Sequence, residues 1–382
     1  MGDSIAKYLK KENLQSFTAW SIYFFINIIF CVKYNPVSAI EPLYIIVIYP
    51  LIVYAIYKIT SYKNIQQQNY FFILISILIL AAVVFLMNYL DKYSIKVDRW
   101  SALSFWSESL KNGIFPYSTY THLGNAATPS PVWQLFHFPF HLLGDTFYGD
   151  IFCLIVFWVF LFFNRRKLNI GAFILLLALS PCFWWEMAVR SDLLCNMLLA
   201  YVFLSSLFYY SKFWNKHIYL AGLIVGLFLC TKMLVAIPLF LYFFPKFLTF
   251  KTKEKLIFAA IVIVAAIVPF MPFMIGESSI LNHPEYNPMM TQSRQGSVWV
   301  VLVGAILIIF SSLKWKTMRD CFFLSGVFLF LLILTVGIRI MLNYDFHFII
   351  FEDEFDKSYF NVSIPFFLFC ICEIRKSRLK GI

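Results

Sequence analysis

The stretch 70–106, YFFILISILILAAVVFLMNYLDKYSIKVDRWSALSFW, decides the fold. Residues 70–90 contain no charged side chain, and a helix of about 20 apolar residues is long enough to cross the hydrocarbon core of a bilayer. Charged residues then appear abruptly, beginning with Asp91 and Lys92 and continuing to Asp98 and Arg99. The pattern predicts a transmembrane helix over 70–90, followed by a polar segment that leaves the membrane.

The composition of the whole chain agrees with this prediction. Of the 382 residues, 61% are hydrophobic, 20% are aromatic and only 13% are charged. Soluble domains contain about 25% charged residues and roughly 45–50% apolar ones. The excess of apolar side chains must face lipid, so we expect an all-α polytopic membrane protein that forms a single integral membrane domain over residues 1–382, without an attached soluble catalytic domain.

Further apolar segments of suitable length recur along the chain and predict about twelve spans. They lie near 17–34, 38–58, 70–90, 147–163, 169–187, 192–211, 218–231, 233–249, 256–275, 298–313, 321–342 and 358–374. The first of these follows Lys7, Lys10 and Lys11 as in a signal peptide, but no small-residue cleavage site follows it. We therefore expect it to be retained as the first span.

The distribution of Lys and Arg predicts the orientation of these spans. Most of the 31 basic residues fall in the short segments that are cytoplasmic when both termini are cytoplasmic, and this positive-inside bias explains the net charge of +11 without a nucleic-acid partner. The expected location is the plasma membrane, which is the inner membrane in bacteria. Three extracytoplasmic loops follow, at 91–146, 276–297 and 343–357. The eight cysteines fall in apolar segments, so no disulfide framework is expected.

The first of these loops contains most of the residues suited to chemistry. Trp100, Leu103, Trp106 and Leu110 recur at helical spacing and predict an amphipathic helix over 99–112 that lies along the membrane surface. Asp98 immediately precedes this helix. Its carboxylate could accept hydrogen bonds from the first turn as an N-cap, or it could act on a substrate at the outer face of the membrane.

A second interfacial segment follows at 132–143, after Pro129 and Pro131. His137 and His141 are four residues apart, a spacing at which two histidines on a helix can bind a metal ion. Pro139 lies between them and no carboxylate completes the ligand set. We therefore interpret both as interfacial aromatic residues with polar tips. The sequence identifies no metal site and leaves a need for a divalent ion open.

Four segments in order resemble the GT-C glycosyltransferases, polytopic enzymes that include protein O-mannosyltransferases and aminoarabinose transferases. The first is the loop with Asp98, GIFPY (113–117) and FPFHLLG (138–144). The others are LSPCFWWEMAVRSDLLCNMLLAYVFLS (179–205), GLIVGLFLCTKMLVAIPLFLYFFP (222–245) and DKSYFNVSIPFFLF (356–369). The resemblance implies transfer of a sugar from a polyprenyl-phosphate carrier, with inversion, to a glycan, lipid or protein acceptor of the cell envelope.

The resemblance also implies roles for particular residues. The loop carboxylate of the family is catalytic, and Asp98 occupies that position. The candidates for substrate binding are Arg99, Tyr117, His122, Asn125, Arg190, Asp192, Lys232, Arg339, Lys357 and Tyr359.

The chemistry of such a transfer suits these residue types. The acceptor hydroxyl must lose a proton, which a carboxylate such as Asp98 can accept. The departing lipid phosphate must be stabilised by positive charge, for which Arg190, Lys232, Arg294 and Arg339 are candidates. Glu186 and Asp192 could instead neutralise Arg190 in a structural role.

Two other classes of protein fit parts of the pattern. An O-antigen polymerase or ligase also has about a dozen spans, although its large outer loop usually lies late in the chain. A transporter or flippase would place charged residues deep in several spans and show repeat symmetry. Here the longest outer loop is early and the charges lie mostly at the outer ends of spans.

Overall fold

The computed structural model describes residues 11–34, 42–61, 65–274, 286–293, 297–344, 351 and 355–374. This part of the chain is almost entirely helical and contains no strand, only two isolated bridges, Tyr120 with Ala126 and Leu168 with Glu373. The expectation of an all-helical protein is confirmed for these residues. The helices fall into two compact units, each assembled from segments that are distant in the sequence.

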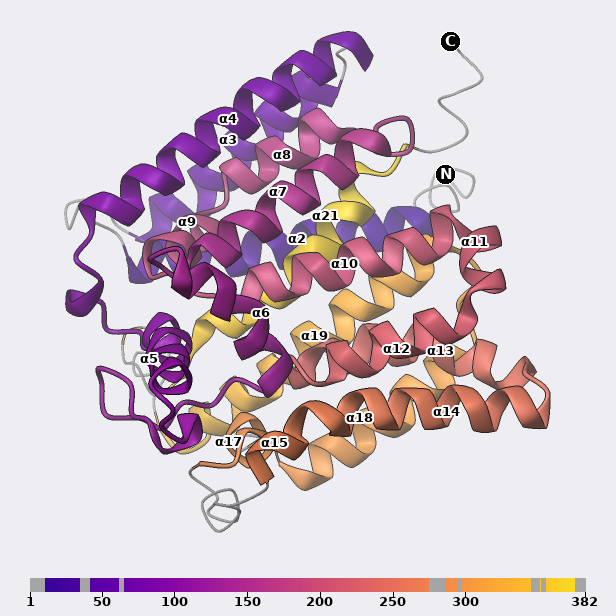
Figure 1. Cartoon of the computed structure of the whole chain (residues 1–382). Helices are drawn as coiled ribbons and strands as arrows, with labels where there is room; N and C mark the ends of the chain where they lie inside the picture. The colour runs from indigo at the N-terminus through magenta and orange to yellow at the C-terminus, as the bar shows by residue number, and fades with distance from the viewer. Residues whose placement is uncertain are drawn as a thin grey trace. The chain divides into compact units, whose positions relative to one another are not determined.

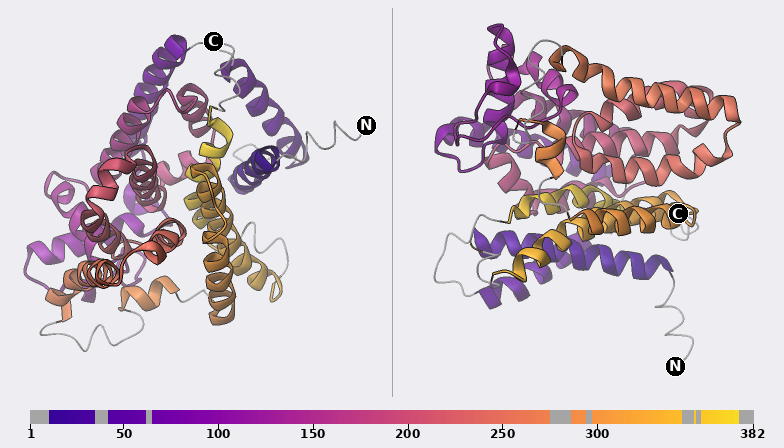
Figure 2. Two further views of the ribbon diagram at one scale, coloured as in Figure 1. Left: turned by 90° about the vertical axis from the view of Figure 1, so that its right-hand side faces the viewer. Right: turned by 90° about the horizontal axis from the view of Figure 1, so that it is seen from below.

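Unit 1 comprises Met1–Tyr89, Phe157–Ala188 and Ser325–Ile382. Its elements are α2 (Lys11–Lys33), α3 (Pro42–Ser61), α4 (Ile65–Tyr89), α8 (Ile170–Ala178), α9 (Pro181–Ala188), η5 (Lys357–Ser363) and α21 (Ile364–Cys372), with the C-terminal parts of α7 (Tyr148–Phe163) and α19 (Met318–Met341). Helix α8 packs against both α3 and α4 (Figure 1), and α2 packs against α21 (Figure 2).

Unit 2 comprises Leu90–Val156 and Val189–Leu324. Its outer-loop elements are η1 (Lys92–Ser94), α5 (Arg99–Lys111), η2 (Pro116–Ser118) and α6 (Pro131–Leu142). They are followed by α10 (Leu193–Tyr209), α11 (Ser211–Lys216), α12 (Ile218–Leu229), η3 (Met233–Val235), α13 (Ala236–Thr249), α14 (Thr252–Ile267), η4 (Val268–Phe270), α15 (Met271–Met274), α17 (Pro288–Ser293) and α18 (Val298–Ser312).

Glycine on one face of α12 allows close packing against α14 in unit 2. Gly222 and Gly226 are one turn apart and face α14, which lies alongside (Figure 1). A Cβ atom placed on Gly226 would lie 2.5 Å from both the Cβ of Ala265 and the carbonyl oxygen of Val262. Small residues at this spacing let two helix backbones approach closely in membranes.

Among the residues that the structure describes, five helices are each long and apolar enough to cross a membrane: Lys11–Lys33, Leu43–Ser61, Gln67–Tyr89, Thr252–Met274 and Met318–Met341. Much of their apolar surface is exposed, as at Leu51 on α3 and Phe85 on α4. Such surfaces are expected to face lipid rather than water. These are the features of a helical membrane protein. Each remaining predicted span coincides with shorter apolar helices, so the total of twelve stays a prediction.

The segment 169–187 differs from the single span predicted for it. It forms α8 and α9, which are bent by 63° at the break between them. Pro181 begins α9, where its missing N–H and its ring interrupt the hydrogen bonding of a continuous helix. Counted together, α8 and α9 would add a sixth crossing to the five.

Candidate functional site

The site is built around Asp98, whose side chain does not cap helix α5. Asp98 occupies the N-cap position, but its carboxylate accepts no hydrogen bond from the first turn of the helix. Instead, Oδ2 accepts hydrogen bonds from Thr121 Oγ1 at 3.0 Å and from Asn125 Nδ2 at 2.7 Å. The interpretation of Asp98 as a side-chain N-cap is therefore wrong, because its carboxylate is held by a distant loop.

A tight turn brings that loop to Asp98. Tyr120 pairs with Ala126 in an antiparallel bridge, and Thr121 donates its backbone N–H to the carbonyl of Asn125 at 2.7 Å. Gly124 closes the turn with φ of +80°, a left-handed conformation that glycine adopts without steric cost. The turn places Thr121 and Asn125 on the same side, so both can donate to one carboxylate oxygen.

The second oxygen of Asp98 remains available. Within the described residues, Oδ1 accepts no hydrogen bond, and the Asp98 side chain is only partly buried. One oxygen thus fixes the orientation of the carboxylate while the other can accept a proton. Asn125, which was predicted to bind substrate, donates one of these hydrogen bonds and so helps to position Asp98.

His122 is held by its neighbours on both sides of the imidazole ring. Nδ1 lies 2.7 Å from Ser101 Oγ, and Nε2 lies 2.8 Å from the carbonyl oxygen of Ile95. The ring also packs on Trp100, with 5.1 Å between the ring centroids. Because both nitrogens are engaged, His122 joins the start of the outer loop to helix α5 rather than presenting a free nitrogen to a substrate.

A second carboxylate, Asp192, is fully buried and forms an ion pair with Lys232. Lys232 Nζ lies 3.0 Å from Oδ1 and 2.8 Å from Oδ2, and Trp133 Nε1 donates to Oδ2 at 2.5 Å. Arg99 Nη1 donates to Ser191 Oγ, also at 2.5 Å. Segments near 99, 133, 192 and 232 therefore converge in unit 2.

Arg190 forms an ion pair with a residue that the sequence did not single out. Its Nη1 lies 2.7 Å from Asp145 Oδ2, and Lys92 Nζ lies 3.8 Å from the same oxygen. Arg190 has φ of 52°, a left-handed conformation that is unusual for a residue other than glycine. Asp145 also accepts a hydrogen bond from Phe147 N at 2.9 Å through its other oxygen, Oδ1.

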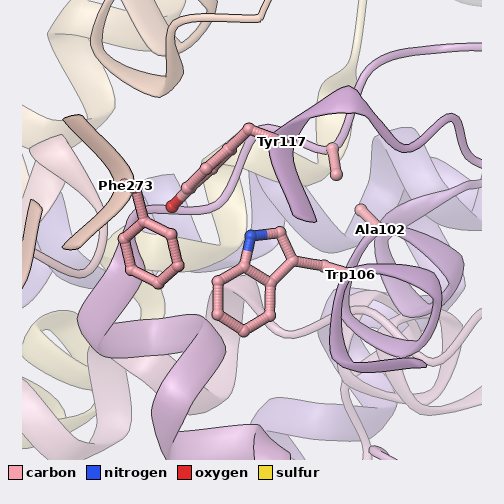
Figure 3. Close-up of a cluster of buried hydrophobic side chains, with 5 residues drawn as sticks. Ala102, Trp106, Tyr117 and Phe273 are labelled. Atoms are coloured by element: carbon pink, nitrogen blue, oxygen red, sulfur yellow. The ribbon is translucent and has the colours of Figure 1, made fainter. Parts of the chain in front are cut away.

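Tyr117 lies in an aromatic cluster and not on a surface. Its ring contacts Trp106 and Phe273, with centroids 5.9 and 5.5 Å away, and Figure 3 shows the three rings facing one another. The hydroxyl donates to the carbonyl of Pro129, and burial raises the pKa of Tyr117 well above its usual value. The prediction that Tyr117 contacts substrate does not fit this placement, since none of its side chain is exposed.

The two histidines of α6 have separate partners. His141 Nε2 lies 2.8 Å from Glu108 Oε2, a contact between α6 and α5. This hydrogen bond lowers the pKa of Glu108, with smaller contributions from Asn112 and Lys111. His137 is fully buried, with Nδ1 directed at the carbonyl of Trp133 and Nε2 3.7 Å from Asp150 Oδ1. Within the described residues, no group of three possible ligands could hold a metal ion.

The remaining predicted residues belong to unit 1. Arg339 is exposed near the end of α19, while Lys357 is buried and donates to the carbonyl of Phe355 at 3.2 Å. Tyr359 is partly exposed in η5. In the same unit Glu186 is fully buried and accepts a hydrogen bond from Asn361 Nδ2 at 2.8 Å. Arg294 lies outside the described residues.

No protein-family model, curated protein or solved structure shows a significant match to this chain.

Proposed function

We propose that this chain is a membrane glycosyltransferase that moves a sugar from a polyprenyl-phosphate carrier to an envelope acceptor on the extracytoplasmic face, with Asp98 as the general base. The observation that carries the proposal is the asymmetric setting of Asp98. Oδ2 is anchored by Thr121 and Asn125, whereas Oδ1 accepts no hydrogen bond from the described residues. A base needs a fixed orientation and one oxygen directed at the proton it removes.

The positive charges near Asp192 suit the other half of the reaction. A departing lipid phosphate develops negative charge, which prearranged cations stabilise. Lys232 keeps 15% of its side chain exposed while paired with the buried Asp192, and Arg99 is partly exposed beside Ser191. Both belong to the same unit as Asp98, and we assign the carrier phosphate to them. The roles of Arg339, Lys357 and Tyr359 in substrate binding remain part of the proposal.

The predicted topology is also part of the proposal. It has about twelve transmembrane spans, both termini in the cytoplasm and the loop 91–146 on the extracytoplasmic side. In that orientation the apolar face of α6 would lie at the membrane surface, where a polyprenyl chain could pack along it. The acceptor, the sugar and any need for a divalent ion are left to experiment. An O-antigen polymerase or ligase is the alternative within the same class of envelope enzymes.

The test uses purified full-length protein with a panel of polyprenyl-phosphate sugars, and measures the release of polyprenyl phosphate. We expect Asp98→Asn to lower the rate by roughly 10²–10⁴-fold, the usual contribution of a general base. The amide oxygen of Asn can still accept from Thr121 and Asn125, so the loop should stay in place.

Asp91→Asn is the matched control. Asp91 lies in the same loop, but its carboxylate caps η1 by accepting from Tyr93 N at 3.1 Å. Asparagine caps about as well as aspartate, so this variant should keep the rate of the wild type. Full activity in a well-expressed Asp98→Asn variant would remove Asp98 from the reaction. Comparing envelope glycans by mass spectrometry, with and without the protein, would then identify the sugar and acceptor.

One observation favours a second candidate, a transporter. Helices α8 and α9 are bent by 63° at the break between them, as in a broken span or a re-entrant loop, and Glu186 is buried within α9. Broken helices and buried charges in spans are typical of substrate and ion sites in transporters. Movement of an intact lipid-linked sugar across vesicles, without release of polyprenyl phosphate, would favour this candidate over the enzyme.

A further inference from the structure

Six exposed lysines gather at one end of unit 2, in three connections between helices. They lie in and beside α11, at the start of α14 and in the segment between α18 and α19. The six are Lys212, Lys216, Lys251, Lys253, Lys314 and Lys316. We call them the lysine collar.

Contacts around the C-terminal half of α13 bring the three connections together. Lys246 on α13 reaches Asn215 of α11, with 3.5 Å between Nζ and Oδ1. Trp315 Nε1 donates to the carbonyl of Leu241 at 2.7 Å, and its ring stacks on Tyr242. Figure 1 shows α11 and the turn between α13 and α14 at the same end of this unit.

The collar carries positive charge that nearby acidic groups do not neutralise. Glu254 accepts a hydrogen bond from the backbone N–H of Lys251 at 2.9 Å, and Asp320 accepts from those of Lys316 and Thr317. Both carboxylates therefore cap helix ends. Within the part of the chain that the structure describes, none of the six ammonium groups forms an ion pair.

Exposed aromatic residues accompany these lysines. Phe213 and Tyr210 are each about half exposed beside Lys212, and Trp214 packs edge-on against Phe203 of α10. Aromatic side chains of this kind concentrate at the depth of lipid headgroups, and basic clusters next to spans attract anionic lipids. The lysine collar thus combines exposed basic residues with neighbouring aromatic residues, the two features expected of a surface that binds lipid headgroups.

We propose that the lysine collar binds the headgroups of anionic phospholipids in the adjoining leaflet. The phosphate groups of several lipids supply the counter-charge that the protein lacks at this end. This inference does not depend on the proposed glycosyltransferase activity, since it concerns the end of unit 2 that the positive-inside bias predicts to be cytoplasmic.

The experiment places the full chain in nanodiscs with equimolar phosphatidylglycerol and phosphatidylcholine, and counts retained lipids by native mass spectrometry. We expect the wild type to retain phosphatidylglycerol preferentially, and Lys251→Gln/Lys253→Gln to reduce this preference roughly tenfold or more. Higher salt should weaken the preference of the wild type. Lys251→Arg/Lys253→Arg should keep it, because the charge is unchanged.

The matched control is Lys96→Gln/Lys111→Gln, which removes two exposed lysines from the loop 91–146 of the same unit. It should retain the lipid preference of the wild type. Equal retention of both lipids by the wild type would overturn the proposal, as would an equal loss in the control. If Lys251→Gln/Lys253→Gln does not fold, Lys314→Gln/Lys316→Gln in the α18–α19 connection is measured instead, with the same expected loss.

Discussion

Asp192 is the residue on which the charge balance of the site depends. It is fully buried, and its carboxylate is compensated by Lys232 and by the hydrogen bond from Trp133 Nε1. When a buried carboxylate loses its cationic partner, the free-energy cost of removing it from water is no longer compensated, and the fold is destabilised. Lys232 therefore has a structural role as well as the proposed role in binding phosphate.

This dual role predicts the behaviour of Lys232 variants. We expect Lys232→Ala to lower the free energy of unfolding by about 3 kcal/mol, because it leaves Asp192 buried without its cation. Combining it with Asp192→Asn should recover part of that loss, since the buried group is then neutral. Denaturant unfolding in detergent measures both changes. A Lys232→Ala protein as stable as the wild type would show that Asp192 finds another partner.

At the scale of single residues, the sequence singled out candidate residues but did not predict their contacts. Asp98, Asp192 and Lys232 were singled out by the family resemblance and by the chemistry of a sugar transfer. Their partners Thr121 and Trp133 were not, because such contacts join segments far apart in the chain and leave no local pattern. The side chain of Asp98 also departed from the usual preference of an N-cap residue, since the loop amide and hydroxyl compete successfully for its carboxylate.

Helices α5 and α6 are joined by the contact between Glu108 and His141. The hydrogen bond from His141 lowers the pKa of Glu108 in the folded state. A carboxyl group with a lowered pKa stabilises the fold above its unfolded pKa, and this stabilisation is lost as pH falls through the lowered value. We therefore expect the stability difference between wild type and Glu108→Gln to be present near neutral pH and to vanish in acid. Thermal unfolding at decreasing pH measures it, and a difference independent of pH would contradict the assignment.

The packing of α12 against α14 predicts opposite outcomes for two glycines. Gly226→Ala should destabilise the protein by about 1–3 kcal/mol, because the new methyl group would meet Ala265 and the backbone of Val262. Gly304→Ala on α18 is the control, since no atom lies within 4 Å of the position of its Cβ. It should be neutral or slightly stabilising, as alanine favours helix more than glycine does. Unfolding of both variants under identical conditions compares them, and equal effects would exclude close packing as the cause.

Helices were the most predictable elements, and their breaks the least. Residues 218–231 and 233–249 were predicted as separate segments, and the structure separates them into α12 and α13. The bend between α8 and α9 was missed although Pro181 was visible, because proline inside an apolar run can either kink or end a helix. Hydropathy measures how apolar a segment is and does not report its direction.

For the whole molecule, orientation in the membrane is the prediction with the widest consequence. Reporter fusions at 115 should be extracytoplasmic, and fusions at 166 and 252 cytoplasmic, as the distribution of basic residues requires. A cytoplasmic reporter at 115 would separate Asp98 from the lipid-linked donor and contradict the proposed function. The division into two discontinuous units could not be predicted, because it depends on contacts between residues that are distant along the chain.

The burial of the native cysteines makes the protein suitable for labelling at introduced cysteines. All eight cysteines are free of disulfide bonds, seven of them are buried, and Cys31 is only partly exposed on α2. A maleimide that cannot cross membranes should therefore react slowly with the natural chain. Single cysteines introduced at exposed positions such as Leu123 or Lys253 can then be labelled over a low background, so accessibility can be mapped from either side of a vesicle without first removing the native thiols.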